Sequence, residues 1–286
     1  MEEKNKIQPS TLYLVGTPIG NLADISDRAK KVLSDVDFVA AEDTRNTYKL
    51  LSCYGIKKEL VSYHEHNKRE AGDRIVVRLL SGESCAIVTD AGMPAISDPG
   101  EDLVRLCADA GIVVSVIPGA CAAVSALALS GLCTKKFVFE GFLPANKSER
   151  RRRLEEIRNE RRTIIFYEAP HKLKATLASL LECYGENRRI SLCRELTKLN
   201  EEIERTNLAS AIALYEVKEP RGEYVLILEG ADEAGVAVAD TAESTLPPEE
   251  QVKKYVSEGL SKMDAIKKVA KELGVPKSEI YDLVSR

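Results

Sequence analysis

The segment Leu12-Tyr13-Leu14-Val15-Gly16-Thr17-Pro18-Ile19-Gly20 joins a short apolar run to a turn rich in glycine and proline. The four apolar residues predict a buried strand, which Gly16 and Pro18 end. The same succession of an apolar run and a glycine-proline turn returns at residues 85–94 and 113–119. Continuous apolar strands are typical of parallel sheets that helices cover on both faces. These segments therefore predict an α/β fold.

Helical periodicity separates the apolar runs. In the N-terminal part we expect a further strand at 37–40 and helices at 26–34, 69–80, 97–110 and 120–130. In the C-terminal part we expect strands at 137–140, 163–166, 190–193 and 224–228, and helices at 148–158, 171–181 and 208–215. This alternation favours two α/β domains with mainly parallel sheets.

The domain boundaries follow from composition and length. We place an N-terminal α/β domain at 1–120 and a C-terminal α/β domain at 121–232. Residues 233–246 are small and acidic, which is typical of a linker. Residues 247–286 show apolar residues at helical spacing around Gly274, which predicts a small tail of three helices, similar to a helix-turn-helix.

Composition narrows the class of protein. A net charge of −4 argues against a molecule that binds nucleic acid over its whole surface. Seven cysteines without a Cys-x-x-Cys pair, and only three histidines, indicate reduced thiols and no metal site. The polar N-terminus does not resemble a signal peptide, and no apolar run is long enough to span a membrane. We expect a cytoplasmic protein.

The loops at 16–20 and 90–94 follow strands and are expected at the strand ends where α/β sheets bind ligands. They are not phosphate cradles, because Pro18 has no N–H to donate and the chain contains no P-loop motif. Rigid turns of this kind can instead present backbone groups to an adenine edge or a zwitterion, and Asp90 can bind hydroxyls or an ammonium. Each loop alone could be a mere tight turn. Because residues 118–120 form a third such turn after a strand, the better interpretation is that the three loops together border a ligand-binding site.

Longer motifs carry a resemblance to a known family. The chain is similar to the tetrapyrrole-methylase superfamily and, within it, to the branch that methylates the ribose 2′-hydroxyl of a cytidine in the decoding region of 16S ribosomal RNA. The similar motifs extend from about residue 11 to 230 and are found at 14–22, 41–45, 90–100, 118–120, 141–144, Lys147, 166–171, 194–198 and 222–223. Met93 and Cys121 depart from the family pattern.

The resemblance implies S-adenosyl-L-methionine as the cofactor, bound between two α/β domains, and a homodimer. It agrees with the loop chemistry, because this cofactor carries no phosphate. The implied cofactor-binding residues are Gly16, Pro18, Ile19, Asp90, Met93, Cys121, Ala122, Tyr167 and Glu223.

Methyl transfer to a ribose hydroxyl requires collinear reactants, and a general base or a nearby cation would assist it. The charged candidates near predicted strand ends are Glu42, Asp43, Arg45, Lys147, Glu168, Arg194, Glu195 and Lys198. For most of them a solvated surface position is the simpler explanation. We place Lys147 and Glu195 nearest the chemistry.

Residues 146–153 contain five basic side chains and one acidic one. This run follows a predicted turn at the cleft, which favours contact with 16S ribosomal RNA or the small ribosomal subunit over a merely solvated helix. The predicted RNA-binding residues are Lys147, Arg150, Arg151, Arg152 and Arg153. The helical tail is interpreted as an accessory substrate-docking unit. Two alternatives stay open: methylation of a small molecule such as a tetrapyrrole, and a non-catalytic regulator that binds nucleic acid.

Overall fold

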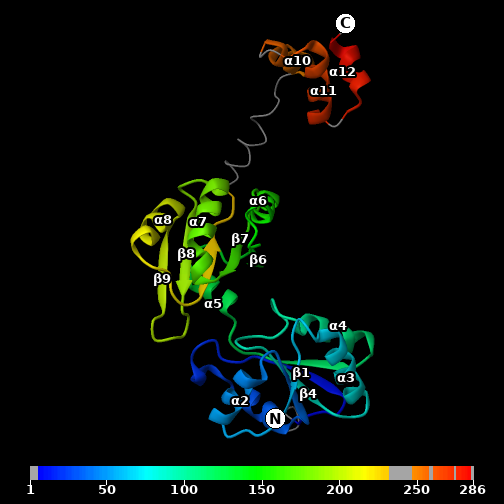
Figure 1. Cartoon of the computed structure of the whole chain (residues 1–286), viewed down its shortest axis with the longest axis vertical. Helices are drawn as coiled ribbons and strands as arrows, with labels where there is room; N and C mark the ends of the chain where they lie inside the picture. The colour runs from blue at the N-terminus through cyan, green and yellow to red at the C-terminus, as the bar shows by residue number, and fades with distance from the viewer. Residues whose placement is uncertain (1–5, 232–246, 258–259, 274, 285–286) are drawn as a thin grey trace. The chain divides into compact units, whose positions relative to one another are not determined.

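The computed structural model describes residues 6–231, 247–257, 260–273 and 275–284. The chain divides into a larger unit that ends at Gly230 and a smaller one that begins at Ala231. Both sheets belong to the larger unit (Figure 1). The predicted split at residues 120 and 121 falls between the elements of the two sheets and stays a prediction. The predicted linker at 233–246 lies outside the described residues.

The first sheet is entirely parallel, as predicted, with strand order β3-β2-β4-β1-β5. Its strands are β1 (Thr11–Val15), β2 (Phe38–Ala41), β3 (Glu59–Ser62), β4 (Cys85–Val88) and β5 (Val113–Ile117). Its helices are α1 (Asp27–Asp35), α2 (Thr44–Cys53), α3 (Lys68–Leu80) and α4 (Gly100–Asp109). A short 3-10 helix, η2 (Leu22–Asp24), precedes α1.

Helices cover both faces of this sheet (Figure 1). Buried residues of α1 and α2 pack on one face, and those of α3 and α4 pack on the other. Ser26 caps α1 as predicted, because its side chain accepts a hydrogen bond from the Ala29 N–H. Sequence patterning missed β3 and α2. β3 begins with an exposed glutamate, and α2 buries only Thr47 and Leu51, so neither shows a strong apolar period.

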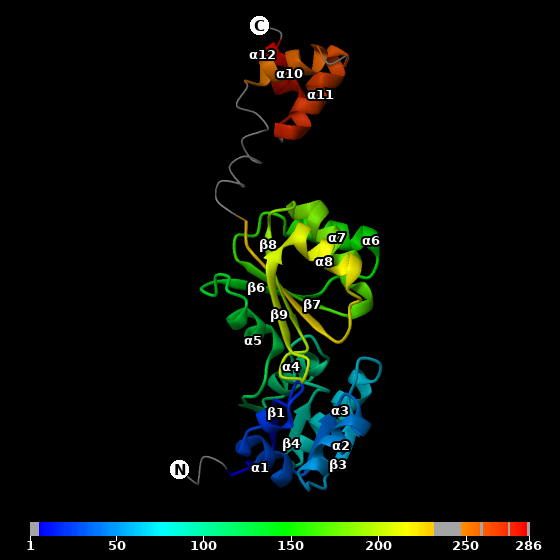
Figure 2. The same ribbon diagram turned by 90° about the vertical axis from the view of Figure 1, so that its left-hand side faces the viewer.

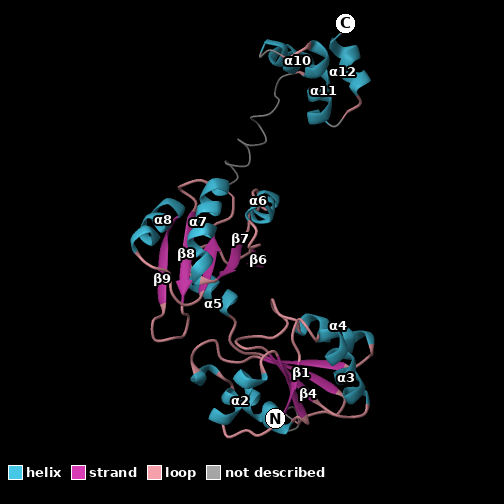
Figure 3. Ribbon diagram, viewed as in Figure 1, coloured by secondary structure: helices cyan, strands magenta, loops and turns pink. Residues whose placement is uncertain are grey.

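The second sheet has the strand order β6-β7-β10-β8-β9. Its elements, in chain order, are α5 (Ala122–Leu129), β6 (Phe137–Phe142), α6 (Lys147–Glu156), β7 (Thr163–Glu168), α7 (Pro170–Tyr184), β8 (Arg189–Arg194), β9 (Glu202–Asn207), α8 (Leu208–Val217) and β10 (Tyr224–Leu228). Figure 3 shows the two sheets as separate groups of strands.

The expectation of a mainly parallel second sheet is wrong. Only β6 and β7 pair in parallel, whereas β10 is antiparallel to both β7 and β8, and β9 is antiparallel to β8. The cause is β9, which the sequence did not reveal because its six residues include a single large apolar side chain, Ile203. Since β9 turns back from β8, the helical crossover through α8 returns β10 in the direction of β9. One unrecognised hairpin therefore reversed the last strand.

Different helices cover the two faces of the second sheet (Figure 2). Buried residues of α6, α7 and α8 form one core with the sheet, which includes Leu154, Leu177 and Tyr215. On the other face α5 packs Ala126 and Leu127 against the sheet. This second face is called the α5 face below.

The smaller unit contains the predicted three helices, α10 (Pro248–Ser257), α11 (Lys262–Leu273) and α12 (Lys277–Val284). They share a core of Val252, Ala265, Ile266, Val269, Ala270 and Ile280. Its apolar positions on α11 recur every three or four residues, which is why the sequence alone sufficed to predict the element. Within the described parts of the chain, no helix has the length and apolarity that crossing a membrane requires.

Candidate functional site

Three loops meet where the parallel strands of the first sheet end. Thr17 and Gly92 exchange backbone hydrogen bonds, with N···O distances of 2.9 and 3.2 Å. The third loop contacts the first through Gly119, because a Cβ atom on Gly16 would lie only 2.6 Å from the Gly119 Cα. Glycine at both positions lets the two backbones touch. The loops therefore form one continuous backbone surface, as their positions after strands predicted.

A cavity of about 500 Å³ opens between this surface and the second sheet; we call it the cleft. Its volume lies within the range of roughly 300–1,000 Å³ that small-molecule sites occupy. From the first sheet and the start of α5 it is lined by Ile19, Glu42, Thr89, Ala91, Gly92, Met93, Ile96, Ser97, Asp98, Cys121 and Ala122. From the second sheet it is lined by Phe142, Tyr167, Glu168, Ala169, Pro170, His171, Cys193, Leu196, Lys198, Glu223, Tyr224 and Val225.

The reversed strand β10 shapes this lining. Tyr224, its first residue, pairs with Glu168 at the end of β7 and with Arg194 at the end of β8. The start of β10 and the ends of its neighbours therefore lie at the same edge of the sheet. Because of this, Glu223 and Val225 reach the cleft. A parallel β10 would place its first residues at the opposite edge.

The charged side chains that line the cleft are predominantly acidic. Glu42 accepts a hydrogen bond from Thr89 Oγ1 at 2.9 Å, and Glu168 accepts one from the Ala169 N–H at 2.9 Å. Four carboxylates line the cavity against a single lysine: Glu42, Asp98, Glu168 and Glu223 against Lys198. Such a lining favours a ligand that carries positive charge.

Lys198 is held between two carboxylates. Its Nζ donates to Glu195 Oε1 at 2.8 Å and to Glu223 Oε2 at 2.9 Å. Burial alone would lower the pKa of Lys198, but these two hydrogen bonds outweigh burial and raise it. The hydrogen bond from Lys198 lowers the pKa of Glu195. Both groups are thus charged at neutral pH, so Lys198 presents a fixed cation to the cleft.

Tyr167 forms an aromatic wall with two phenylalanines. Its ring lies edge-on to Phe139 and Phe142, at centroid distances of 5.0 and 5.6 Å. Burial raises the pKa of Tyr167, which keeps its hydroxyl protonated. Phe142 lines the cleft while 58% of its surface stays exposed.

The comparisons with known proteins agree with this geometry. The family model described as Tetrapyrrole (Corrin/Porphyrin) Methylases matches residues 11–212, which covers the first sheet and the second sheet as far as α8. The chain belongs to this family.

The relatives of this tetrapyrrole methylase include proteins named Ribosomal RNA small subunit methyltransferase I. The one from Halalkalibacterium halodurans is 49% identical, over 96% of this chain and 94% of its own. The one from Bacillus subtilis is 45% identical, over 99% of this chain and 96% of its own. A solved structure of uroporphyrin-III C-methyltransferase from Thermus thermophilus, complexed with S-adenyl homocysteine, has a TM-score of 0.54 at 17% identity and covers 77% of this chain and 97% of its own.

The structure brings most of the predicted cofactor-binding residues of this tetrapyrrole methylase together. Those that line the cleft are Ile19, Met93, Cys121, Ala122, Tyr167 and Glu223. Gly16 lies behind them against Gly119, and Pro18 lies in the same loop. Asp90 is exposed and does not line the cavity; its Oδ2 accepts a hydrogen bond from Asn46 Nδ2 at 3.1 Å.

The two residues predicted nearest the chemistry fall outside the cavity lining. Glu195 lies behind Lys198, as described above. Lys147 lines a separate cavity of about 130 Å³ between α6 and α7, beside Arg151 and Arg158. Lys147 therefore does not line the cleft, and its assignment to the chemistry stays a prediction.

Two of the four arginines in the arginine run, residues 150–153, are held by neighbouring groups of the protein. Arg150 is a correction to the predicted RNA contacts, because its side chain is buried and donates to Ser179 Oγ at 3.0 Å and to the Ala145 carbonyl at 3.1 Å. Arg153 donates to Glu140 at 2.8 Å and pairs with Glu156. Arg151 and Arg152 extend into solvent, and each has a glutamate 3.9 Å away.

Sequence reasoning missed several residues of the cleft, above all Asp98, Phe142 and His171. Asp98 lies in the segment that follows β4, as Asp90 does. The position after a strand, which singled out Asp90, therefore applied to Asp98 as well. Nothing in the local sequence of Phe142 distinguishes it from a core phenylalanine. Among the described residues, no group of three or more His, Cys, Asp or Glu side chains is arranged to hold a metal ion.

Proposed function

We propose that this chain transfers the methyl group of S-adenosyl-L-methionine to the 2′-hydroxyl of a cytidine in the decoding region of 16S ribosomal RNA. The observation that carries the proposal is a cleft with a backbone wall and an acidic lining, in a chain 49% identical to a named ribosomal RNA methyltransferase. That relative is aligned over 96% of this chain, so the similarity extends beyond the family model into the C-terminal unit.

The cleft fits the proposed cofactor. S-adenosyl-L-methionine carries a sulfonium and an ammonium but no phosphate, which suits an acidic cavity that lacks a phosphate cradle. When bound, it supplies an activated methyl group. Ile19, Met93, Cys121, Ala122 and Tyr167 offer the apolar contacts that an adenine and a methionine chain require. Gly16 and Pro18 determine the backbone conformation of the loop behind these side chains.

The acidic groups are assigned to the polar ends of the cofactor. Glu223 lies at the cavity wall, where its carboxylate can accept hydrogen bonds from hydroxyl or ammonium groups. Asp90 does not line the cavity. We retain it as a second polar contact to the cofactor, at the start of the loop at 90–94. If that assignment is right, replacing Asp90 with alanine weakens cofactor binding in a folded protein, as calorimetry would show; an unchanged affinity would remove Asp90.

For methyl transfer to the ribose hydroxyl, we assign the assisting role to a cation and not to a free general base. To accept the methyl group, the ribose hydroxyl must lose its proton to solvent or to a nearby carboxylate. A lysine ammonium near the hydroxyl lowers the pKa of that hydroxyl and thereby raises the fraction of nucleophile. Lys198 supplies that charge, and Glu195 is a positioning residue that acts through it.

The variant Lys198→Met tests this assignment. Turnover with saturating RNA should fall by roughly 100-fold or more, which is the lower end of the range for lost acid-base assistance. The affinity for S-adenosyl-L-methionine and the KM for RNA should change little. Lys174→Met is the matched control, since Lys174 also pairs with a glutamate, at 3.3 Å, but does not line the cleft. Glu195→Gln should lower turnover less and shift its pH profile; equal turnover in all variants would refute the assignment.

The proposed RNA contacts outside the cleft are Lys147, Arg151, Arg152 and Arg153. The ion pairs of Arg151 and Arg152, and that of Arg153 with Glu156, are exposed, so RNA phosphates can compete for these arginines. Replacing Arg151 and Arg152 with glutamate should weaken binding and reduce its dependence on salt. A salt-independent interaction would contradict the assignment. The C-terminal helical unit is proposed as an accessory docking element for the same substrate.

The decisive experiment offers labelled methyl donor with small ribosomal subunits that lack the modification. Label in the RNA, at a ribose that resists alkaline cleavage, supports the proposal. Label only in a tetrapyrrole precursor would identify a small-molecule methylase instead, and cofactor binding without any transfer would indicate a regulator. An RNA acceptor also implies a cytoplasmic location, where small subunits are assembled.

We further propose a homodimer. The outer side of β5 is unpaired in the first sheet, and Val113 and Val116 on it are 63% and 48% exposed. An apolar edge strand of this kind favours pairing with a second copy. Light scattering of the purified protein checks the mass, and Val113→Lys should then favour the monomer.

A further inference from the structure

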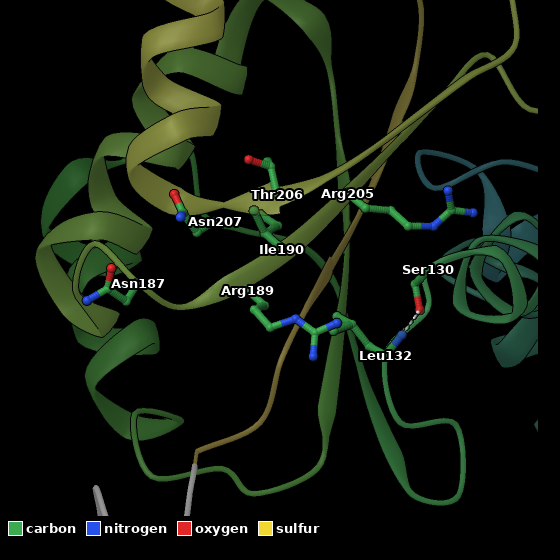
Figure 4. Close-up of a pocket in the computed structure, with 8 residues that line it drawn as sticks. All are labelled: Ser130, Leu132, Asn187, Arg189, Ile190, Arg205, Thr206 and Asn207. Carbon is green, nitrogen blue, oxygen red and sulfur yellow. Dashed lines mark hydrogen bonds between the residues drawn. The ribbon is translucent and has the colours of Figure 1, made fainter.

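A second cavity lies on the second sheet, away from the cleft. It has a volume of about 310 Å³ and opens at the end of α5, beside the open end of the β8–β9 hairpin. We call it the basic cavity. Its lining residues, drawn in Figure 4, are Ser130, Leu132, Asn187, Arg189, Ile190, Arg205, Thr206 and Asn207.

The lining contains two guanidinium groups and no carboxylate. Arg205 donates from Nε and Nη2 to the Leu129 carbonyl, at 3.0 and 2.6 Å, and no carboxylate in the described residues pairs with it. Arg189 has one carboxylate partner, Glu229, at 3.3 Å, and its side chain stays 60% exposed. The positive charge of this cavity is therefore poorly compensated.

The arginine run at 150–153 is less available to an anion than its sequence implies. Arg153 is bound by two glutamates and Arg150 is buried against carbonyls. Only Arg151 and Arg152 extend into solvent, each with a glutamate 3.9 Å away. The two arginines of the basic cavity lie 16 residues apart in sequence, on paired strands, and only folding brings them together.

Neutral donors complete the lining. Asn207 caps α8, where its Oδ1 accepts from the Ser210 N–H at 2.8 Å, so its amide NH₂ remains available. The Asn187 amide has no hydrogen-bond partner among the described residues. Figure 4 shows the asparagines on one side of the cavity and the arginine heads on the side of Ser130 and Leu132. Guanidinium and amide donors around an open cavity suit a phosphate group.

The position of the basic cavity connects it with the cleft. The cleft lies at the start of α5, and the basic cavity lies at its end, eight residues or about 12 Å further on. Along β8, Cys193 lines the cleft and Arg189 lines the basic cavity, which again gives a separation of about 13 Å. Both residues point to the α5 face, because they are an even number of positions apart on one strand.

From this arrangement we infer that the basic cavity binds a backbone phosphate of the RNA strand whose target nucleotide enters the cleft. The inference rests on the proposed function for the identity of the strand, and it adds a contact site that the motifs did not indicate. The bound phosphate would fix the register of the strand relative to the methyl donor, since phosphate contacts position a nucleic acid without reading its sequence.

The test compares Arg189→Gln, Arg205→Gln and the double variant with the wild-type protein. Binding to a small-subunit ribosomal RNA transcript is measured by filter binding at several salt concentrations, and methylation is measured with small subunits that lack the modification. We expect the double variant to bind RNA about tenfold more weakly or worse, as for the removal of charge-assisted hydrogen bonds. The slope of log K against log salt should fall by about 0.7 for each phosphate that the protein no longer neutralises.

Two controls keep the result interpretable. Arg74→Gln removes an exposed arginine with one glutamate partner at 3.6 Å on α3, and it should change neither quantity. The affinity for S-adenosyl-L-methionine, measured by calorimetry, should stay at the wild-type value in all variants. If Arg205→Gln unfolds because it uncaps α5, Arg189→Gln alone carries the test, since Glu229 is the only carboxylate partner of Arg189 among the described residues.

The outcomes separate the two proposals. Wild-type methylation with unchanged RNA affinity and salt slope in the double variant would overturn the inference and leave the function standing. A wild-type protein that neither binds nor methylates the RNA would overturn both. Loss of binding to inorganic phosphate in the double variant, without any loss of RNA affinity, would identify an adventitious anion site and also overturn the inference.

Discussion

The two sheets contribute different chemistry to the same cleft. The first sheet supplies mainly backbone, through glycine-rich loops in which Gly16, Gly92 and Gly119 pack closely together. The second sheet supplies mainly side chains, among them Tyr167, Lys198 and Glu223. A backbone wall is rigid and tolerates little change, whereas side chains can differ without loss of the fold. We propose that the first sheet forms the backbone side of the cofactor site, and that the second sheet adds Tyr167 and Glu223 to this site and supplies Lys198 to the acceptor.

Strand direction explains the difference. In the all-parallel first sheet every strand ends at one edge, so all the loops that follow strands converge there. In the mixed second sheet the same edge receives the ends of β7 and β8 and the start of β10. Residues that would lie apart in a parallel sheet are thereby gathered around Lys198.

The largest effect is expected from Gly16→Ala in the backbone wall. The new methyl group would meet the Gly119 Cα at 2.6 Å and the Gly119 N at 2.7 Å, so one loop must move. We expect the affinity for S-adenosyl-L-methionine to fall by at least about tenfold, or about 1.4 kcal/mol, in calorimetry.

Gly111→Ala is the control for this substitution, because nothing lies within 4 Å of its Cβ position. Its φ of +70° should cost about 1–2 kcal/mol of stability without touching cofactor affinity. A Gly16 variant that binds the cofactor normally would break the distinction between a backbone wall and a side-chain wall.

An intermediate effect is expected from Phe142→Ala in the second sheet. Its exposed ring at the cleft can stack on the acceptor base, and such stacking contributes about 1–3 kcal/mol per base. The KM for RNA should rise while cofactor affinity stays nearly constant. Phe137→Ala, on the same strand, is 42% exposed but outside the cleft and should leave both unchanged. If cofactor affinity fell instead, the division of labour between the sheets would need revision.

The smallest effect is expected from Glu202→Gln in the hairpin that reverses β10. Its hydrogen bond with Lys218 lowers the pKa of Glu202 below the ordinary 4.5, with Arg194 assisting. A lowered pKa means that the interaction stabilises the fold above about pH 4.5 and is lost as the pH falls further. Because the pair is partly exposed, we expect a loss of about 0.2–1 kcal/mol at pH 7 in urea unfolding.

The pH dependence provides the check on this last prediction. As the pH falls through the lowered pKa of Glu202, the difference between the variant and the wild type should shrink, because the glutamate is then protonated in both the folded and the unfolded state. A difference that persists undiminished as the pH falls would assign the effect to packing of the hairpin and not to its charge.

The sequence by itself determined the parallel sheet, the three loops, the helical tail and the exclusion of a phosphate cradle. Each depends on local information: continuous apolar runs, glycine and proline at fixed positions, and a 3.6-residue period. The family resemblance supplied Tyr167 and Glu223, although an all-parallel second sheet could not have placed Glu223 at the cleft.

The tertiary structure alone decided the direction of β10, the burial of Arg150, the position of Lys147 on the helical layer and the pairing of Lys198 with Glu195. It also brought Arg189 and Arg205 together in the basic cavity. These features depend on which strands pair and which charges meet across the fold, and such contacts leave no periodic signal along the chain.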